Sequence, residues 1–255
     1  MKKLKLLTKI YSSKKLVFGH IQREIEEQIK DLNVTIKSTI LDDDGFVTIA
    51  LEGEDEIAAA NYIASLFGES KEFVDLKEGD TVKGYICSSG KVGFGIFVDI
   101  GIKTPYQVDV LVPMFVLREQ LLEGKKIPVR KIIELFGLID NFPLELQLTM
   151  VSVGTKKIEG RLSDNQVAMF KKWVEDGLDK LYILGTSRET IQDVLKDTRH
   201  SHDIVEIETV GWMENVLTCK FNTSAKGLIP RIGKILPRAK FEIFSPAQVV
   251  KTLKD

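Results

Sequence analysis

Three stretches of the chain differ in how their hydrophobic and polar residues are spaced. Residues 1–75 combine short runs of alternating apolar and polar residues with segments whose apolar residues recur every three or four positions. Residues 76–149 hold short β-type runs interrupted by glycine, and residues 150–255 return to the mixed pattern. A chain of 255 residues has room for three small domains, and these shifts predict boundaries near residues 75 and 149.

The first stretch predicts the order strand, helix, strand, strand, helix. "KLKLLTKIY" has strand character, and Asp44-Gly45 is the turn dipeptide of the hairpin in residues 34–53. The first helix has one apolar face, formed by Phe18, Ile21, Ile25, Ile29 and Leu32. "DEIAAANYIASLFG" is the second helix, closed by Gly68, and "KEFVDL" is expected to add a last strand. Two helices on one face of a small antiparallel sheet give an α+β domain of ferredoxin-like order.

The third stretch repeats this order after an additional helix. Ser163 and Gln166 predict a capping box at the start of the additional helix, and Thr186 and Glu189 predict one at the next helix. Pro230 leaves the start of the following helix open. Residues 150–255 are therefore expected to form a helix plus a second ferredoxin-like α+β domain.

The central stretch contains "GKVGFGIFVDIG", residues 90–101. Its glycines match neither common phosphate-loop pattern, and it lies between strands, away from any helix N-terminus. Five short β-type runs surround it: "DTVKGYIC", "FGIFVDI", "VDVLVPMFV", "KKIPVRKII" and "LELQLT". Five strands in about 75 residues, with a bend or bulge at Gly93 and Gly95, predict a small closed antiparallel barrel over residues 76–149.

These residues resemble the OB-fold RNA-binding repeat of the ribosomal protein S-one type. The shared features are Gly79-Asp80 before the first strand, Gly84 within it, Phe-Gly-x-Phe-Val at 94–98, and the short apolar strand at 111–113. The resemblance covers residues 76–149. The whole chain also resembles an uncharacterised family of archaeal proteins that embeds such a barrel.

The resemblance implies that Phe94 and Phe97 project from the barrel and stack on bases, with Lys83 and Lys91 close to phosphates. Residues three apart on a strand point to opposite faces, so presenting both rings requires a bend or bulge at Gly95. The alternative is that one or both rings fill the barrel core.

The barrel departs from the family pattern in its charges. Pro113 and Met114 stand where the family often has a histidine, and the last predicted strand carries Glu145 without a basic residue. Asp109 adds a further negative charge. Either the flanking domains supply the positive charge for a nucleic acid, or the barrel docks a protein.

Positive charge is concentrated near the C-terminus although the net charge is only −1. Residues 220–240 carry six basic residues and no acidic one, and Lys226, Arg231, Lys234 and Arg238 are the candidates for phosphate contact. The alternative is an ordinary solvated helix face. Tyr182, in "LYILG", weakly resembles a stacking residue of the RNA-recognition fold, and its alternative role is that of an ordinary sheet residue.

Other functional classes find little support in the sequence. Cys87 and Cys219 are too few and too far apart for a disulfide framework or a zinc site, which suits a reducing cytoplasm. No apolar run approaches the roughly 20 residues that span a bilayer, and the start lacks the pattern of a signal peptide. The acidic residues at 42–44 suit a tight turn, and those at 52–56 precede a helix, whose N-terminus favours negative charge. Neither group therefore requires a metal.

The sequence therefore predicts a cytoplasmic α+β protein with a central five-stranded OB-fold barrel between two ferredoxin-like domains. The expected function is non-enzymatic binding of single-stranded or ribosomal RNA, without cofactor, metal or membrane. The alternative is a protein-interaction factor that docks on RNA polymerase or the ribosome. The particular RNA and the oligomeric state stay open.

Overall fold

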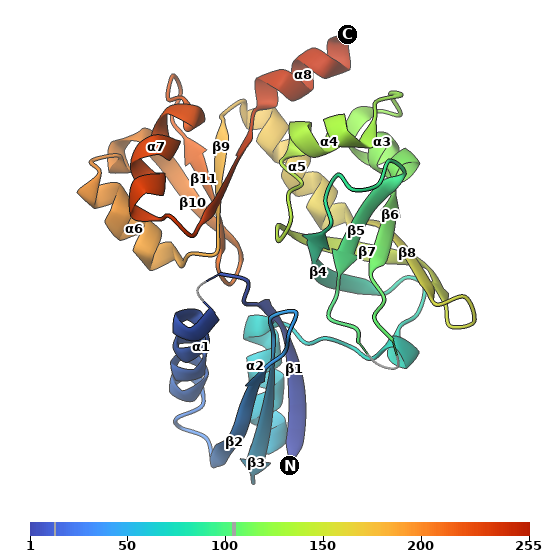
Figure 1. Ribbon diagram of the computed structural model, residues 1–255, viewed down its shortest axis with the longest axis vertical. Coiled ribbons are helices and arrows are strands. Elements are labelled where there is room, and N and C mark those ends of the chain that lie inside the picture. Colours follow the sequence, from blue (N-terminus) through green and yellow to red (C-terminus); the bar gives the residue numbers. More distant parts are fainter. Residues whose placement is uncertain (13, 104–105) are drawn as a thin grey trace.

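A computed structural model describes residues 1–12, 14–103 and 106–255, and these residues form three sheets connected by helices (Figure 1). The sheets follow one another along the chain: a three-stranded sheet, a closed five-stranded barrel and a four-stranded sheet. The fold is therefore α+β, as the sequence predicts.

The N-terminal sheet has the strand order β1-β3-β2 and two helices packed against it. Its elements are β1 Lys2–Lys9, α1 Lys14–Gln28, β2 Val34–Leu41, β3 Phe46–Gly53 and α2 Glu56–Phe67. Alternation in β1 turns Leu4 and Leu6 into a core that both helices share. The predicted turn at Asp44-Gly45 joins β2 to β3, with Gly45 at φ 94°.

The barrel closes in the order β4-β5-β6-β8-β7, with β7 returning to β4. Its strands are β4 Thr81–Cys87, β5 Gly95–Asp99, β6 Val110–Pro113, β7 Pro143–Ser152 and β8 Lys157–Leu162. Two helices, α3 Met114–Leu122 and α4 Val129–Phe136, connect β6 to β7. β6 and β8 pair in parallel, so the barrel is mixed.

The C-terminal sheet has the order β10-β11-β9-β12 with antiparallel neighbours. Its strands are β9 Lys180–Leu184, β10 Ile204–Gly211, β11 Glu214–Cys219 and β12 Lys240–Phe244. The helices of this region are α5 Asp164–Asp176, α6 Arg188–Asp197, α7 Ala225–Ile235 and α8 Pro246–Lys254, with a 3-10 turn at Ser201–Asp203. The predicted order of an additional helix followed by strand, helix, strand, strand, helix, strand is observed, and α8 follows it.

One aromatic core joins the barrel to the C-terminal sheet. Trp173 on α5 is 1 % exposed and lies 5.8 Å from the Tyr182 ring on β9. Tyr182 stacks on Phe142 at 4.8 Å, and its hydroxyl donates to the Phe136 carbonyl oxygen at 3.1 Å. Tyr182 is fully buried, so the suggestion that it stacks on a base is wrong and its role as a sheet residue is confirmed.

The N-terminal domain is held to both other regions by polar contacts. Lys9 Nζ lies 2.6 Å from the Asp99 carboxylate of the barrel. Tyr11 donates its hydroxyl hydrogen to Glu214 at 2.6 Å, and Trp212 Nε1 donates to Glu24 at 2.8 Å. Trp212 lies at the tip of the β10–β11 hairpin, which reaches the apolar core of the N-terminal domain.

The predicted closed barrel of five strands is confirmed, but its strands differ from the prediction. The barrel is mixed, and its last strand, β8, lies beyond residue 149. "KKIPVRKII" forms helix α4 because Val129, Ile132, Leu135 and Phe136 recur at helical spacing and are buried on one face. Its β-branched residues suggested a strand.

Two further predictions fail in the flanking regions. "KEFVDL" does not add a strand, because Phe73–Asp75 forms a 3-10 turn that buries Phe73. The N-terminal region therefore lacks, among its described residues, the fourth strand of a ferredoxin-like order. The second cap is Ser187 and not Thr186, since Ser187 Oγ accepts from the Thr190 N–H.

Candidate nucleic-acid interface

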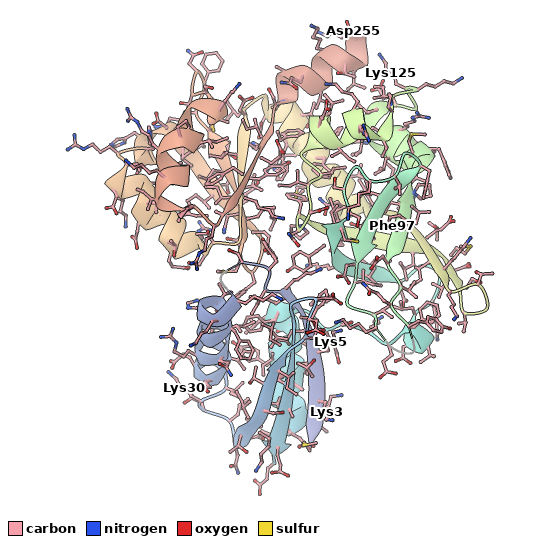
Figure 2. The ribbon with its side chains drawn as sticks, in the orientation of Figure 1. Lys3, Lys5, Lys30, Phe97, Lys125 and Asp255 are labelled. Carbon is pink, nitrogen blue, oxygen red and sulfur yellow. The ribbon has the colours of Figure 1, made fainter. Side chains whose placement is uncertain are left out.

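The two predicted stacking rings lie together on the outside of the barrel. Phe94 is 56 % exposed and Phe97 is half-buried. Their centroids are 6.1 Å apart and their planes meet at 89°, an edge-to-face pair (Figure 2 labels Phe97). Edge-to-face packing holds each ring while leaving the exposed part of Phe94 free for another planar group.

Local backbone geometry explains why both rings reach the surface. Ile96 and Val98 point into the barrel core, so alternation turns Phe97 outward. Phe94 lies in a bend before β5 begins, so it does not follow the strand alternation. Gly95 allows β5 to approach β6, because a Cβ at this position would lie 2.4 Å from the Val112 carbonyl oxygen. The expected bend is therefore found just before Gly95.

The two barrel lysines lie in different places. Lys91 is exposed in the β4–β5 loop that also leads to Phe94. Lys83 is exposed on β4, four residues before Cys87, which pairs with Phe97. Four residues of a strand span about 13 Å, so Lys83 is distant from the ring pair. Only Lys91 lies on the same loop as the rings.

Acidic groups lie on the barrel beside the ring pair. Burial raises the pKa of Asp109, and the neighbouring Asp99 raises it further. Burial and the nearby Asp109 raise the pKa of Cys87 to about 12. A thiol with this pKa stays protonated at neutral pH, which argues against Cys87 as a nucleophile. Of the described lysines on this side of the barrel, Lys9 is paired with Asp99, whereas Lys91 is exposed and can face a phosphate, in line with the few basic residues noted in the sequence.

The predicted basic residues lie on and after α7. Lys226, Arg231 and Lys234 are exposed on this helix, and within the described residues none of the three forms an ion pair. Arg238 follows the helix, and its backbone carbonyl oxygen accepts a hydrogen bond from Ser12 Oγ at 3.2 Å. We refer to Lys226, Arg231, Lys234 and Arg238 as the α7 basic set.

The structure does not bring the ring pair and the α7 basic set together. The rings belong to the barrel, whereas α7 packs on the C-terminal sheet, on the opposite side of the molecule in Figure 1. A single ligand that contacts both would have to be long enough to pass around the protein. The two features therefore act as separate surfaces.

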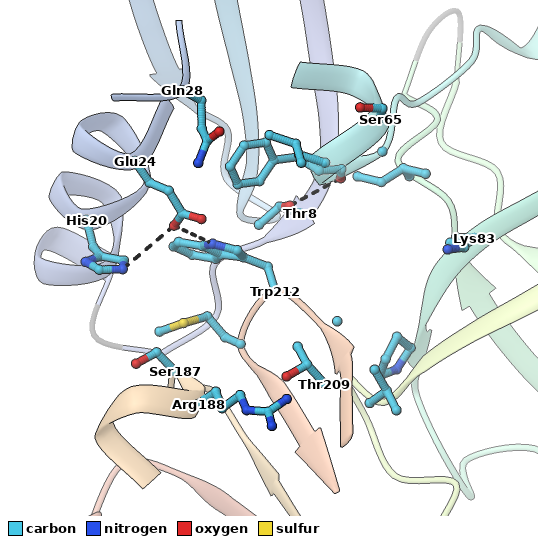
Figure 3. A pocket seen from close by; sticks show the side chains of 18 of the residues that line it. Thr8, His20, Glu24, Gln28, Ser65, Lys83, Ser187, Arg188, Thr209 and Trp212 are labelled. Atoms are coloured by element: carbon cyan, nitrogen blue, oxygen red, sulfur yellow. Dashed lines mark hydrogen bonds and ion pairs between the residues drawn. The ribbon is translucent and has the colours of Figure 1, made fainter. Parts of the chain in front are cut away.

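A cleft that the sequence did not reveal lies between the three regions of the chain (Figure 3). It measures about 1200 Å³, and its walls come from α1, α2, β4, the start of α6 and the β10–β11 hairpin. Lys83 lines this cleft, together with Arg23, Arg188 and Trp212. Only the packing of the three regions creates the cleft, so no short motif could have indicated it.

The described residues give no support to a metal site, since none of their His, Cys, Asp and Glu side chains form a cluster of three able to hold an ion. His200 Nδ1 lies 2.7 Å from Asp203, which explains its position in the loop after α6. No helix in the described part of the chain is long and apolar enough to cross a membrane.

Three family models match consecutive parts of the chain. They are the DUF2110 N-terminal domain at residues 3–72, the DUF2110 central domain at residues 76–174 and the DUF2110 C-terminal domain at residues 178–244. No curated protein matches the sequence.

Solved structures show only distant similarity. The uncharacterized protein MJ1198 from Methanocaldococcus jannaschii matches at 16 % identity over 35 % of this chain and 96 % of its own, with a TM-score of 0.24. The intact alpha subunit of aIF2 from Pyrococcus abyssi matches at 9 % identity over 66 % of this chain and 96 % of its own, also with a TM-score of 0.24. These scores are too low to carry an argument about function.

Proposed function

The chain belongs to the DUF2110 family, and we propose that it is a non-enzymatic RNA-binding protein whose central barrel is an OB-fold. The exposed edge-to-face pair of Phe94 and Phe97 carries this proposal. A base stacked on an exposed aromatic ring contributes about 1–3 kcal/mol without reading sequence. Single-stranded RNA offers such unpaired bases.

The position of the rings on the barrel supports this ligand. OB-folds bind oligonucleotides on the face of their second and third strands and on the loop between their first and second strands. In this barrel those elements are β5, β6 and the β4–β5 loop, and they carry Phe97, Phe94 and Lys91. The placement of the aromatic pair and of Lys91 on these elements supports the proposal of a nucleic-acid ligand.

Replacing both Phe94 and Phe97 with alanine should weaken binding of a short oligouridylate by at least about 30-fold, because two stacking contacts are lost. Fluorescence anisotropy with a labelled oligonucleotide measures this change. Phe221→Ala is the matched control, since Phe221 is 82 % exposed on another part of the chain. Unchanged affinity in the double variant, with the fold intact by circular dichroism, would contradict the stacking role.

The α7 basic set is proposed as a second, sequence-independent contact for the phosphates of a longer RNA. Each phosphate neutralised on a single strand adds about 0.7 to the slope of log affinity against log salt. Changing Lys226, Arg231 and Lys234 together to alanine should therefore lower this slope by about 1–2 for a long single strand. A short oligonucleotide that covers only the barrel should keep its slope.

The contrary result is an equal slope for parent and variant on the long strand. It would show that these exposed side chains only solvate the helix, and the RNA would then contact the barrel alone.

A protein-interaction factor is the second candidate function, because an exposed aromatic ring such as Phe94 also anchors protein interfaces. Asp99 is 5 % exposed and paired with Lys9, and burial favours the neutral form of Asp109, so neither carboxylate selects between an RNA and a protein. On this alternative the Phe94 and Phe97 double variant would bind RNA as the parent does, and it would lose co-purification with RNA polymerase or the ribosome.

A further inference from the structure

The cleft between the three regions has no role in the proposed function. Lys83, Tyr85 and Pro143 contribute the barrel wall, while Arg23 lies on α1 and Arg188 begins α6. Figure 3 shows Arg188 and Thr209 on the C-terminal side and Lys83 on the barrel side of the cleft. A volume of about 1200 Å³ exceeds what a single small ion needs and suits an extended ligand.

Most carboxylates of the cleft are already engaged by donors of the protein. Glu24 accepts the indole hydrogen of Trp212 at 2.8 Å and lies 3.8 Å from His20 Nε2. Glu27 pairs with Lys30 on the same helix. Glu189 is the exception among the described carboxylates of this cleft, because no ion pair or hydrogen bond occupies its side chain. Lys30 therefore neutralises Glu27, while Glu24 and Glu189 keep their negative charge within the described part of the cleft.

The cationic side chains of the cleft, in contrast, are not engaged in ion pairs within the described residues. In the described part of the chain, Arg23, Lys83 and Arg188 form no ion pair. Arg23 donates from Nε to the Gly19 carbonyl oxygen at 3.1 Å, which leaves both terminal nitrogens free. Lys83 pairs in the strand register with Glu145, but that carboxylate accepts from Ser163 Oγ at 2.7 Å. Each of the three regions thus presents one uncommitted cation to the same cleft.

We propose that this cleft binds a ligand with two or more phosphate groups, held by Arg23, Lys83 and Arg188. Arginine side chains form paired, charge-assisted hydrogen bonds to phosphate oxygens, and lysine adds a point charge. The three cations come from three separate elements around a cleft of about 1200 Å³, which suits a polyphosphate or an RNA backbone better than a single phosphate ion. The ligand would bridge the three regions of the chain.

The intrinsic fluorescence of Trp212 provides a signal for ligand binding in this cleft. This residue lines the cleft and is one of only two tryptophans of the chain. The conservative change Trp173→Phe leaves Trp212 as the single tryptophan, because Trp173 is the other one and lies in the aromatic core. Titrating this variant with inorganic triphosphate should change the Trp212 fluorescence with saturation. Isothermal calorimetry on the unaltered protein measures the affinity independently.

Changing Arg23, Lys83 and Arg188 together to alanine should weaken triphosphate binding at least about tenfold, since three charge-assisted contacts are removed. The matched control changes Arg130, Lys171 and Lys172 to alanine, which removes the same number of exposed cations outside both the cleft and the α7 basic set. This control should bind triphosphate as the parent does. Exposed side chains are changed in both cases, so neither variant is expected to lose its fold.

A second titration distinguishes between free polyphosphate and an RNA backbone as the ligand. If triphosphate has no effect but a long oligouridylate changes the Trp212 fluorescence in a way that needs the three cations, the ligand is the RNA backbone. That signal should persist when Phe94 and Phe97 are alanine, so the cleft and the ring pair are tested separately. The proposal is overturned if neither anion changes the Trp212 signal, or if the three-cation variant and the parent respond equally.

Discussion

Replacing Trp173 with alanine should lower the free energy of unfolding by about 3–5 kcal/mol. The indole is 1 % exposed and lies among the rings of Phe170, Tyr182 and Phe244, at centroid distances of 5.6–5.8 Å. Its Nε1 also donates to Glu208 at 2.9 Å, so truncation leaves both a cavity and a carboxylate without its donor. Because this core joins the barrel to the C-terminal sheet, both should unfold at lower denaturant concentration.

Chemical denaturation followed by far-ultraviolet circular dichroism measures this effect. Trp173→Phe keeps most of the ring packing and loses only the hydrogen bond to Glu208, so it should cost clearly less than the alanine change. Phe94→Ala removes an exposed ring and should leave the midpoint nearly unchanged. An alanine variant at Trp173 as stable as the parent would show that the aromatic core does not hold the two regions together.

The barrel could be predicted because its strands carry strong local signals. The glycines and phenylalanines of residues 93–97 indicate the position of β5, whereas the outward direction of both rings was implied only by the resemblance to the S-one type repeat. The prediction failed where the secondary structure that individual residues favour differs from the one that buries their apolar side chains. β-branched residues made "KKIPVRKII" look like a strand, while the burial of Ile132 and Phe136 on one face makes it a helix. β8 was missed although it pairs with the neighbouring β7, because the short segment "KIEGRL" carries only two apolar side chains, Ile158 and Leu162.

The cleft could not be predicted because its residues share no sequence pattern. Arg23, Lys83 and Arg188 lie in three regions, and each looks like an ordinary surface cation in its own element. Their proximity follows from the contacts of the β10–β11 hairpin with the N-terminal domain, especially Trp212 with Glu24. Sequence patterns report on single elements, whereas this site depends on how three domains pack.

Between pH 5 and pH 8, ionisation of Glu214 should lower the free energy of unfolding of the parent protein by about 2–3 kcal/mol, and changing Glu214 to glutamine should remove this loss. Glu214 is 1 % exposed at the junction of the three regions, and burial raises its pKa to about 7. Hydrogen bonds from the Tyr11 hydroxyl and the Met213 N–H lower this pKa only in part. Tyr85 of the barrel lies close enough that the Glu214 charge adds to the rise in its own pKa.

The sign of the effect follows from proton binding. Between the unfolded pKa of 4.5 and the folded pKa of about 7, the folded chain keeps a proton on Glu214 that the unfolded chain releases. This contribution to stability is therefore fully present below about pH 4.5 and is lost as the pH rises through 7. Glutamine resembles the protonated carboxyl and cannot ionise, so the variant should gain on the parent as the pH rises.

Urea denaturation of parent and variant at several pH values gives this difference, and other titrating groups cancel in the comparison. Glu189→Gln, an exposed change, should leave the pH profile of the parent unaltered. Tyr11→Phe removes a hydrogen bond that stabilises the carboxylate, so it should raise the pKa of Glu214 and extend the loss of stability to higher pH. If parent and Glu214→Gln lose stability in parallel from pH 5 to pH 8, the carboxylate is ionised throughout this range. The junction would then hold a buried charge that Tyr11 and Met213 stabilise sufficiently by their hydrogen bonds.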